Sequence, residues 1–255
     1  MAPARRVSAE TRRDTGSGTF QPGRRYPLTM DGNGDGVGVE TIDRWEGGLG
    51  WLAHPGEALA RASHALAADG DVWVVDPVDC PGLDALLAEL GAVRGVVVGL
   101  DRHKRDAAAL ANRHGVSVHL PRPLGRIADE LDAPTTVFGA ELADTGYRTI
   151  TVVDNPLWAE VALHREEDGT LLVPEAVGTA PHYVVGGERL GVHPMLRLLP
   201  PRRALSALDP ERVLVGHGVG VLEGASAALD DALAGSRRNA PRLYAKALAG
   251  VLGIR

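Results

Sequence analysis

The feature that most constrains the fold is an alternation of short apolar segments with helix-like segments between residues 71 and 120. The apolar segments are predicted strands over residues 71–76, 95–99 and 116–120. The segments between them are predicted helices, over residues 83–90 and up to His114, each ended by a glycine. Strands connected through helices lie parallel in one sheet that the helices cover, so this region predicts an α/β fold with a parallel sheet.

The flanking regions extend this pattern. Upstream, residues 47–54 are predicted as a short strand pair and the alanine-rich residues 56–70 as a helix. Downstream, residues 121–134 are a predicted connector to a second half of the fold. Its predicted strands span residues 147–153, 158–165, 169–173, 182–185 and 212–215. A helical stretch rich in Leu and Arg precedes the last strand, and helices are predicted over 222–233 and 241–252. Two successive halves of sheet and helix predict an αβ/βα four-layer sandwich, in a single domain over residues 47–255.

The first 40 residues differ from the rest in composition. Residues 1–27 contain six arginines against Glu10 and Asp14, a balance of +4, which leaves −10 for the remainder of a chain whose net charge is −6. This segment offers little apolar surface to bury, so residues 1–40 are predicted to be a disordered, basic and Gly-rich leader. Residues 31–40, DGNGDGVGVE, begin like a calcium loop. The closing position holds Ile42 instead of a carboxylate, which favours a flexible turn.

Charge, hydropathy and cysteine content limit the classes of partner. The acidic body argues against nucleic acid, and no apolar run approaches the ~20 residues of a membrane span. Cys80 is the only cysteine, which excludes an internal disulfide and a multi-cysteine zinc site. No apolar segment follows Arg5-Arg6, so a signal peptide is not indicated. We expect a cytoplasmic protein whose partner is a small molecule, with an oligomeric state that the sequence does not indicate.

Three predicted strands end in reactive side chains. Asp76 ends the first strand of the alternating region, where it either caps the following turn or supports a site. Glu175 follows an apolar strand of the second half. His217 lies between Gly216 and Gly218 after the last strand, and this setting leaves an imidazole accessible.

A fourth place is the charged segment Asp101-Arg102-His103-Lys104-Arg105-Asp106, between a predicted strand and a predicted helix. His103 and Asp106 are three residues apart and would share a helix face if the helix begins by residue 102. The segment is therefore either part of a site or the solvated first turn of a surface helix.

Other reactive groups give weak signals. No nucleophile elbow and no Walker loop is present, and Cys80 has no obvious base beside it. His164, His182 and His193 have no spacing typical of metal ligands, so we predict structural roles for them. The glycines of residues 216–220 leave a nucleotide-binding α/β protein as a weaker alternative.

Taken in order, the four places resemble the metallo-β-lactamase fold family over about residues 47–235. Asp76 matches a strand that ends in Asp, and Gly216-His217-Gly218 matches a late strand that ends in Gly-His-Gly. Residues 169–176, GTLLVPEA, are similar to the family's G-T-L-L-x-G-D-A, with Glu175 in place of its aspartate. The resemblance implies an αβ/βα sandwich and a site whose metal ions activate water for hydrolysis.

The sequence departs from the family at the metal ligands. In one register the family's H-x-H-x-D-H falls on Asp101, His103, Arg105 and Asp106. In the other, Asp106 keeps the aspartate and the histidines fall on Arg102, Lys104 and Ala107. At most one of three histidines remains in either register. The family's G-H-x-P-G becomes NPLWA at residues 155–159, which contains no histidine.

The resemblance therefore implies a divergent, hydrolase-like protein with an impaired or altered metal site and an unknown substrate. The remaining ligands would be His103, Asp106, Glu175 and His217, with Asp101 as a further candidate. They would hold one divalent ion, either zinc, iron or manganese, and its bound water would be the nucleophile. In the alternative, no metal binds and Arg105 or Lys104 pairs with Asp76, Asp106 or Glu175. The protein is then a non-catalytic binding or scaffold module. Asp76 and Arg105 are predicted to support the site.

Overall fold

The computed structural model describes residues 39–252. The predicted leader lies outside this range except for its last two residues, and so does the turn predicted from residue 31. Within residues 39–252, no helix has the length and apolar character that a membrane span requires.

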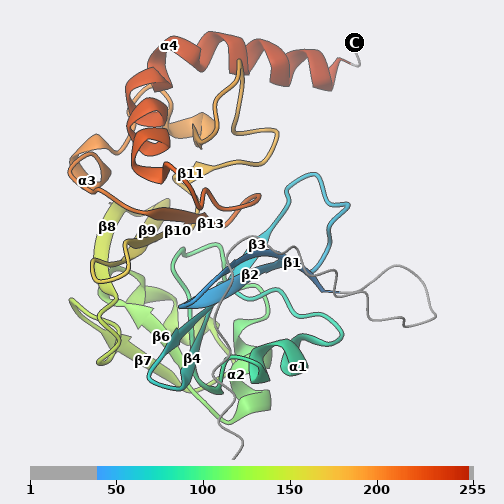
Figure 1. Ribbon diagram of the computed structural model, residues 1–255, viewed down its shortest axis with the longest axis vertical. Helices are drawn as coiled ribbons and strands as arrows, with labels where there is room; N and C mark the ends of the chain where they lie inside the picture. The colour runs from blue at the N-terminus through green and yellow to red at the C-terminus, as the bar shows by residue number, and fades with distance from the viewer. Residues whose placement is uncertain (1–38, 253–255) are drawn as a thin grey trace, which may run out of the picture. The chain divides into compact units, whose positions relative to one another are not determined.

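The larger of two main β-sheets has seven strands in sequential order (Figure 1). They are β1 (Glu40–Trp45), β2 (Gly48–Leu52), β3 (Ala62–Ala68), β4 (Asp71–Val75), β5 (Ala92–Val97), β6 (Val118–Pro121) and β7 (Thr135–Phe138). Neighbours from β1 to β4 are antiparallel, and neighbours from β4 to β7 are parallel. The predicted parallel region is therefore confirmed for β4, β5 and β6, and β7 extends it.

The second sheet has four strands in the order β13-β10-β9-β8. These are β8 (Arg148–Asn155), β9 (Trp158–Arg165), β10 (Thr170–Val173) and β13 (Arg212–Val215). Strands β10 and β13 run parallel, whereas β8, β9 and β10 form antiparallel pairs. A small separate pair is made by β11 (Val177–Gly178) and β12 (Gly191–Val192).

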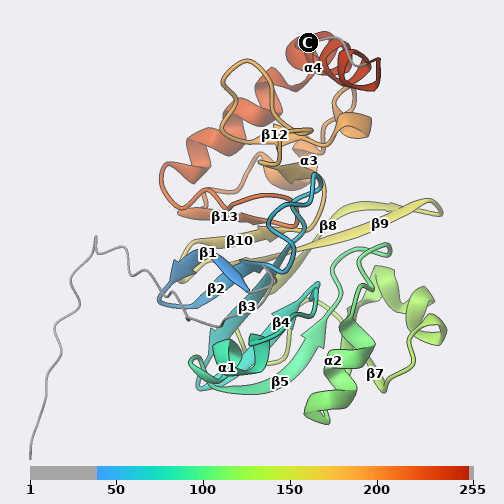
Figure 2. The same ribbon diagram turned by 90° about the vertical axis from the view of Figure 1, so that its right-hand side faces the viewer.

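Helices cover the outer face of each sheet, as Figure 2 shows. Helices α1 (Leu83–Ala88) and α2 (Ala107–His114) pack on the larger sheet, and α4 (Ala225–Val251) packs on the smaller one. The short α3 (Arg202–Leu205) and two 3₁₀ helices, η1 (Arg122–Glu130) and η2 (Pro194–Leu196), complete the chain. The predicted αβ/βα sandwich is confirmed.

The two-residue alternation of the strands explains the layers. On β4, Val72 and Val74 join the cluster under α1 and α2, whereas Trp73 and Val75 point into the space between the sheets. On β13, Leu214 likewise joins the inter-sheet cluster while its two neighbours face α4. Strands buried on both faces need continuous apolar sequence, which is the pattern that identified them.

Four predictions of secondary structure are wrong. Residues 47–54 contain one strand, β2, whose hairpin partner is β1 at residues 40–45, and not a strand pair. Residues 56–70 contain strand β3 instead of a helix, because Ala62, Ala65 and Leu66 are all buried in a strand paired on both sides by β2 and β4. Residues 182–185 contain no strand: 182 and 183 lie in a turn, and 184 and 185 have no regular structure. The helices predicted over 222–233 and 241–252 are one helix, α4, with Pro241 inside it. Tertiary pairing outweighs the helix propensity of alanine, and packing on the sheet outweighs the hydrogen bond that a proline loses.

Candidate metal centre

The carboxyl ends of four strands meet at one place. Strands β4 and β5 end side by side with Val75 opposite Val97, and β10 and β13 end with Val173 opposite Val215. The amide of Ala62 donates a 2.9 Å hydrogen bond to the carbonyl of Gly216, which joins the two sheets there. Residues just beyond these ends are therefore brought together from distant parts of the sequence.

Two glycines permit this close approach. A Cβ on Gly216 would lie 2.0 Å from the carbonyl oxygen of Pro174, a distance that no side chain tolerates. Gly218 has a φ of +96° and would place a Cβ 2.2 Å from Thr179 Oγ1. The glycines around His217 are thus required by backbone contacts as well as by access to the imidazole.

His103 lies between two carboxylates. Its Nδ1 is 2.9 Å from Asp76 Oδ2, and its Nε2 is 3.0 Å from Glu175 Oε2. The other oxygen of Asp76 accepts a 2.8 Å bond from the amide of Gly99. Asp76 therefore fixes the ring of His103 and directs its Nε2 toward Glu175.

His217 reaches the same carboxylate from the opposite sheet. Its Nδ1 is 2.8 Å from the carbonyl of Leu59, which only accepts, so Nδ1 donates the proton. Its Nε2 lies 3.0 Å from Glu175 Oε2. Donor atoms of His103, Glu175 and His217 all lie within 4.8 Å of one another.

These contacts determine where the imidazoles of His103 and His217 carry protons and lone pairs. In a neutral imidazole whose Nδ1 donates a proton, Nε2 carries a lone pair. Two such lone pairs facing one carboxylate oxygen repel it. His217 Nε2 therefore needs either a second proton or a shared cation. His103 Nε2 needs one of these or a hydrogen bond from Arg105 Nη2, which lies 3.3 Å away.

His193 contacts Glu175 in a different way. The amide of Met195 donates a 3.2 Å bond to His193 Nδ1, so the proton of the neutral ring is on Nε2, 3.3 Å from Glu175 Oε1. His193 thus donates to Glu175 and needs no cation. Burial raises the pKa of Glu175, but hydrogen bonds from His103, His193 and His217 outweigh burial and hold it well below its usual range.

Arg105 lies half-buried beside these groups. Its Nη1 donates to the carbonyls of Ala62 at 2.6 Å and Asp76 at 2.7 Å, and Nη2 lies 3.3 Å from the carbonyl of Gly216. Nη2 is also 3.3 Å from His103 Nε2. Burial lowers the pKa of Arg105, while the charges of Asp76 and Glu175 act in the opposite direction.

The remaining predicted ligands point elsewhere. Asp101 Oδ2 accepts bonds from the amide of Ala159 and from Arg126, each at 2.9 Å. Asp106 Oδ2 accepts a 2.8 Å bond from the amide of Asp79. The structure thus brings together His103, Glu175 and His217 with Asp76 and Arg105, and it places Asp101 and Asp106 in main-chain hydrogen bonds outside this group.

Three groups around the centre were not predicted to be part of it, and one of them, His193, was assigned a structural role. His193 lies at the start of η2, and only the folding of residues 176–193 brings it to Glu175. Tyr183 Oη donates a 3.0 Å bond to the carbonyl of Glu175. Glu160 accepts from the amides of Glu175 at 2.8 Å and Ala176 at 2.7 Å. No spacing in the sequence marks these residues.

Glu160 is completely buried in β9. In addition to the two amides, the indole Nε1 of Trp158 donates to it at 2.9 Å. Burial raises the pKa of Glu160 to about 7, although the three donors oppose the shift. Glu160 therefore positions the main chain of Glu175 without contacting the imidazoles.

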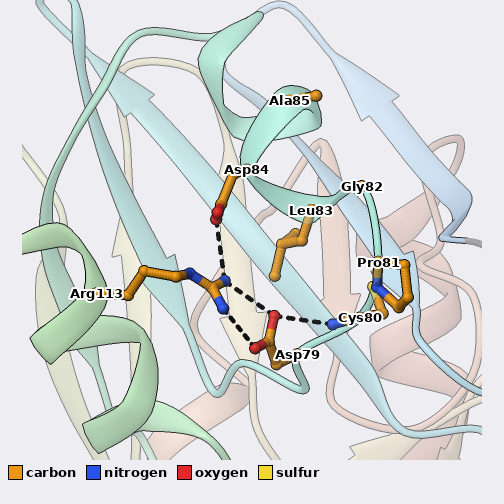
Figure 3. Close-up of a pocket in the computed structure, with 8 residues that line it drawn as sticks. All are labelled: Asp79, Cys80, Pro81, Gly82, Leu83, Asp84, Ala85 and Arg113. Carbon is orange, nitrogen blue, oxygen red and sulfur yellow. Dashed lines mark hydrogen bonds and ion pairs between the residues drawn. The ribbon is translucent and has the colours of Figure 1, made fainter.

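A surface pocket beside α1 is separate from this centre (Figure 3). It is lined by Asp79, Cys80, Pro81, Gly82, Leu83, Asp84, Ala85 and Arg113. The guanidinium of Arg113 already donates hydrogen bonds to both carboxylates of the pocket, at 2.6 Å to Asp79 and 2.9 Å to Asp84. Burial, with the charge of Asp79, raises the pKa of the Cys80 thiol to about 11. The thiol is thus protonated at neutral pH.

Comparisons with known proteins address the fold. No family model and no curated protein sequence matches this chain. Among solved structures, the chain is similar to TMB-1, with 13% identity and a TM-score of 0.57, over 81% of this chain and 99% of that one. It is similar to the diflavin flavoprotein A 5 fragment 1–254 of Nostoc sp. PCC 7120, with 14% identity and a TM-score of 0.56, over 80% and 98% of the two chains.

A third similar structure is the metallo-β-lactamase FIM-1 of Pseudomonas aeruginosa in its mono-zinc form. It shares 8% identity and a TM-score of 0.51, over 79% of this chain and 97% of that one. At such identities the likeness concerns the fold and not the activity. The order of the strands, the two sheets with helices outside them and these neighbours together show that this chain has the metallo-β-lactamase fold.

Proposed function

We propose that this chain is a hydrolase-like protein with an altered metal site, which binds one divalent ion through His103, Glu175 and His217. The observation that carries the proposal is the pair of imidazoles. Each has its Nδ1 anchored by an acceptor, and each directs its Nε2 at the same oxygen of Glu175. Anchoring of the distal nitrogen by a carboxylate or a carbonyl is the usual arrangement around metal-binding histidines.

The donor set fits one ion and does not fit two. Two imidazole nitrogens and a carboxylate are a ligand set that zinc, iron and manganese accept. A second ion would need donors where Arg105 lies, and its guanidinium is 3.3 Å from His103 Nε2. A cation so close opposes further positive charge. These charges support a site that is altered from the metal centre implied by the family resemblance.

A bound divalent ion would lower the pKa of a water molecule and so supply a nucleophile for hydrolysis. The protein residues have separate tasks. Asp76 and the carbonyl of Leu59 orient His103 and His217, and His193 holds the second oxygen of Glu175. Arg105 places a fixed positive charge beside the centre. The substrate is not identified by these residues.

Metal analysis tests the proposal. Protein purified without chelator, or loaded with zinc, iron or manganese, is expected to hold about one ion per chain, and EDTA is expected to lower its Tm. His217→Ala and Glu175→Gln should lose the ion. His119→Gln is the matched control, because His119 is a half-buried histidine on β6 outside the centre. Protein that retains none of the three metals, with a Tm unchanged by EDTA, would contradict the proposal.

One observation favours a second candidate, a non-catalytic binding or scaffold module without metal. Arg105 already bridges carbonyls from both sheets, so a cation connects the strand ends without any ion. In this case two protons on His103 and His217 supply the positive charge that Glu175 attracts. Two results together would support this candidate. The purified protein would hold no metal, and the Arg105→Met variant would be strongly destabilised.

A further inference from the structure

We propose that the centre takes a small anionic compound that carries an apolar chain. This inference rests on the proposed function, because it names the class of ligand for the same site. Two features carry it: a set of exposed apolar side chains that flank the centre, and an exposed guanidinium beside them.

The apolar rim consists of Leu59, Leu157, Met195 and Val219, which are 48%, 87%, 77% and 50% exposed. Each lies on a segment of main chain that contacts the centre or adjoins one of its residues. The carbonyl of Leu59 accepts from His217 Nδ1, and Val219 lies two residues after His217. The amide of Met195 donates to His193 Nδ1.

Leu157 is tied to the centre through its neighbour. It precedes Trp158, whose ring lies edge-on to His193 with the centroids 5.0 Å apart. Single exposed apolar side chains are common on protein surfaces, but a group of them beside buried reactive groups is typical of a binding surface. The rim therefore predicts a ligand with an apolar part that leaves water on binding.

Arg102 gives the surface beside the apolar rim a preference for anionic ligands. Its guanidinium lies 4.4 Å above the ring of Trp158, and its Nη1 donates a 3.2 Å bond to the carbonyl of Leu157. The carboxylate near it, Asp101 at 3.5 Å, is also bound by Arg126 at 2.9 Å. Two guanidinium groups share one carboxylate, so the group of Arg102, Arg126 and Asp101 has an excess of positive charge. An anionic group is attracted there and an ammonium group is repelled.

A small molecule suits this arrangement better than a protein surface. The side chain of Glu175 is 13% exposed and that of His217 is 8% exposed. Side chains with so little exposed area are contacted more readily by a narrow ligand than by a broad protein surface. The rim residues come from four separate connections, which leaves polar main chain between them.

Binding of a homologous series tests the proposal without reference to turnover. Titration calorimetry of the full chain, with and without zinc, would use butanoate, hexanoate and octanoate, and octylamine as the cationic probe. Each added methylene should tighten binding about two- to fourfold, as expected for partial to complete burial of a CH₂ group. Octylamine should bind at least tenfold more weakly than octanoate.

The variants use exposed residues, so that folding is preserved. Leu157→Ser and Met195→Ser should each weaken octanoate binding about tenfold, and Arg102→Met should remove the preference for octanoate over octylamine. The matched control is Leu248→Ser, because Leu248 is 60% exposed on α4 and has no contact with the centre. It should bind octanoate unchanged.

Two outcomes overturn the proposal. One is binding that does not depend on chain length or on Leu157 and Met195. The other is a change of oligomeric state in Leu157→Ser and Met195→Ser with unchanged octanoate binding, which would make the rim a protein interface. Failure of the proposed function is a different result. Chain-length-dependent binding by protein that holds no metal would overturn the metal proposal and leave the ligand class intact.

Discussion

The guanidinium of Arg105 donates a 2.7 Å hydrogen bond to the main-chain carbonyl of Asp76, the residue whose carboxylate holds His103. The same Nη1 atom also donates to the carbonyl of Ala62 at 2.6 Å. A permanent positive charge is therefore built into the main chain around the centre. It connects the ligand-bearing segment of residues 101–106 to the strand ends of both sheets.

Arg105→Met is expected to lower the free energy of unfolding by about 3 kcal/mol, because it leaves buried carbonyls without donors. The corresponding fall in Tm is roughly 10 °C for a chain of this size. Arg105→Lys should recover only part of this, since an ammonium group lacks the planar fork. Urea titration measures the effect.

The control for this prediction is Arg94→Met, because the side chain of Arg94 is 69% exposed. It should change the free energy of unfolding by less than about 0.5 kcal/mol. If Arg105→Met unfolds at the same urea concentration as the wild type, the main-chain role of Arg105 is contradicted. Where metal binds, Arg105→Met should also bind it more tightly, because a repelling charge has been removed.

His193→Ala is expected to weaken metal binding by about 10- to 100-fold while the ion is still bound by His103, Glu175 and His217. The reason is that His193 holds Glu175 Oε1, and without it the carboxylate is free to rotate. Competition with a chromogenic chelator measures the affinity. Complete loss of the ion would instead make His193 a ligand, and unchanged affinity would remove it from the centre.

Glu160→Ala is expected to destabilise the protein by about 3–5 kcal/mol, since three buried donors lose their acceptor. Glu160→Gln keeps an oxygen for the amides of Glu175 and Ala176 but turns an N–H group toward the indole of Trp158. It should therefore cost less, about 1–2 kcal/mol. Chemical denaturation of the two variants checks the order, and equal destabilisation would contradict this account of the hydrogen bonds.

Cys80 should react slowly with alkylating reagents. Its pKa is raised to about 11, so at every pH below that value a smaller fraction is thiolate than in an ordinary thiol. At pH 8 the rate should be roughly a hundredfold lower than that of a free cysteine, and it should rise with pH up to about 11. In urea-unfolded protein the rate should become ordinary. Rapid alkylation of the folded protein at pH 7 would contradict the assigned environment.

Much of the fold could be predicted from the sequence, because the strands that bury both faces are continuous apolar runs. Strands β9 and β13 were predicted with their observed bounds, and β4 was predicted one residue too long. The error at β3 has a clear cause. Residues 62–68 are small and rich in alanine, so their sequence favours a helix, whereas pairing with β2 and β4 determines the strand.

Local sequence also determined which residues stand near the strand ends. Asp76 directly follows β4, and Glu175 and His217 come two residues after the ends of β10 and β13. Local sequence could not determine where their side chains point. His103 and Asp106 were expected to share a helix face, but α2 begins only at Ala107, and the two side chains point to different partners. Arg105, with a φ of +39°, turns its guanidinium inward between them.

The centre as a whole was decided by tertiary structure. His193 shows no spacing relative to the other histidines, and it reaches Glu175 only because β11 and β12 pair and carry it there. The hydrogen bonds that fix each ring involve main-chain carbonyls and amides, which every sequence possesses and no motif marks. Apolar periodicity is a local property that a sequence displays directly, whereas the partners of a buried polar group depend on contacts between distant segments.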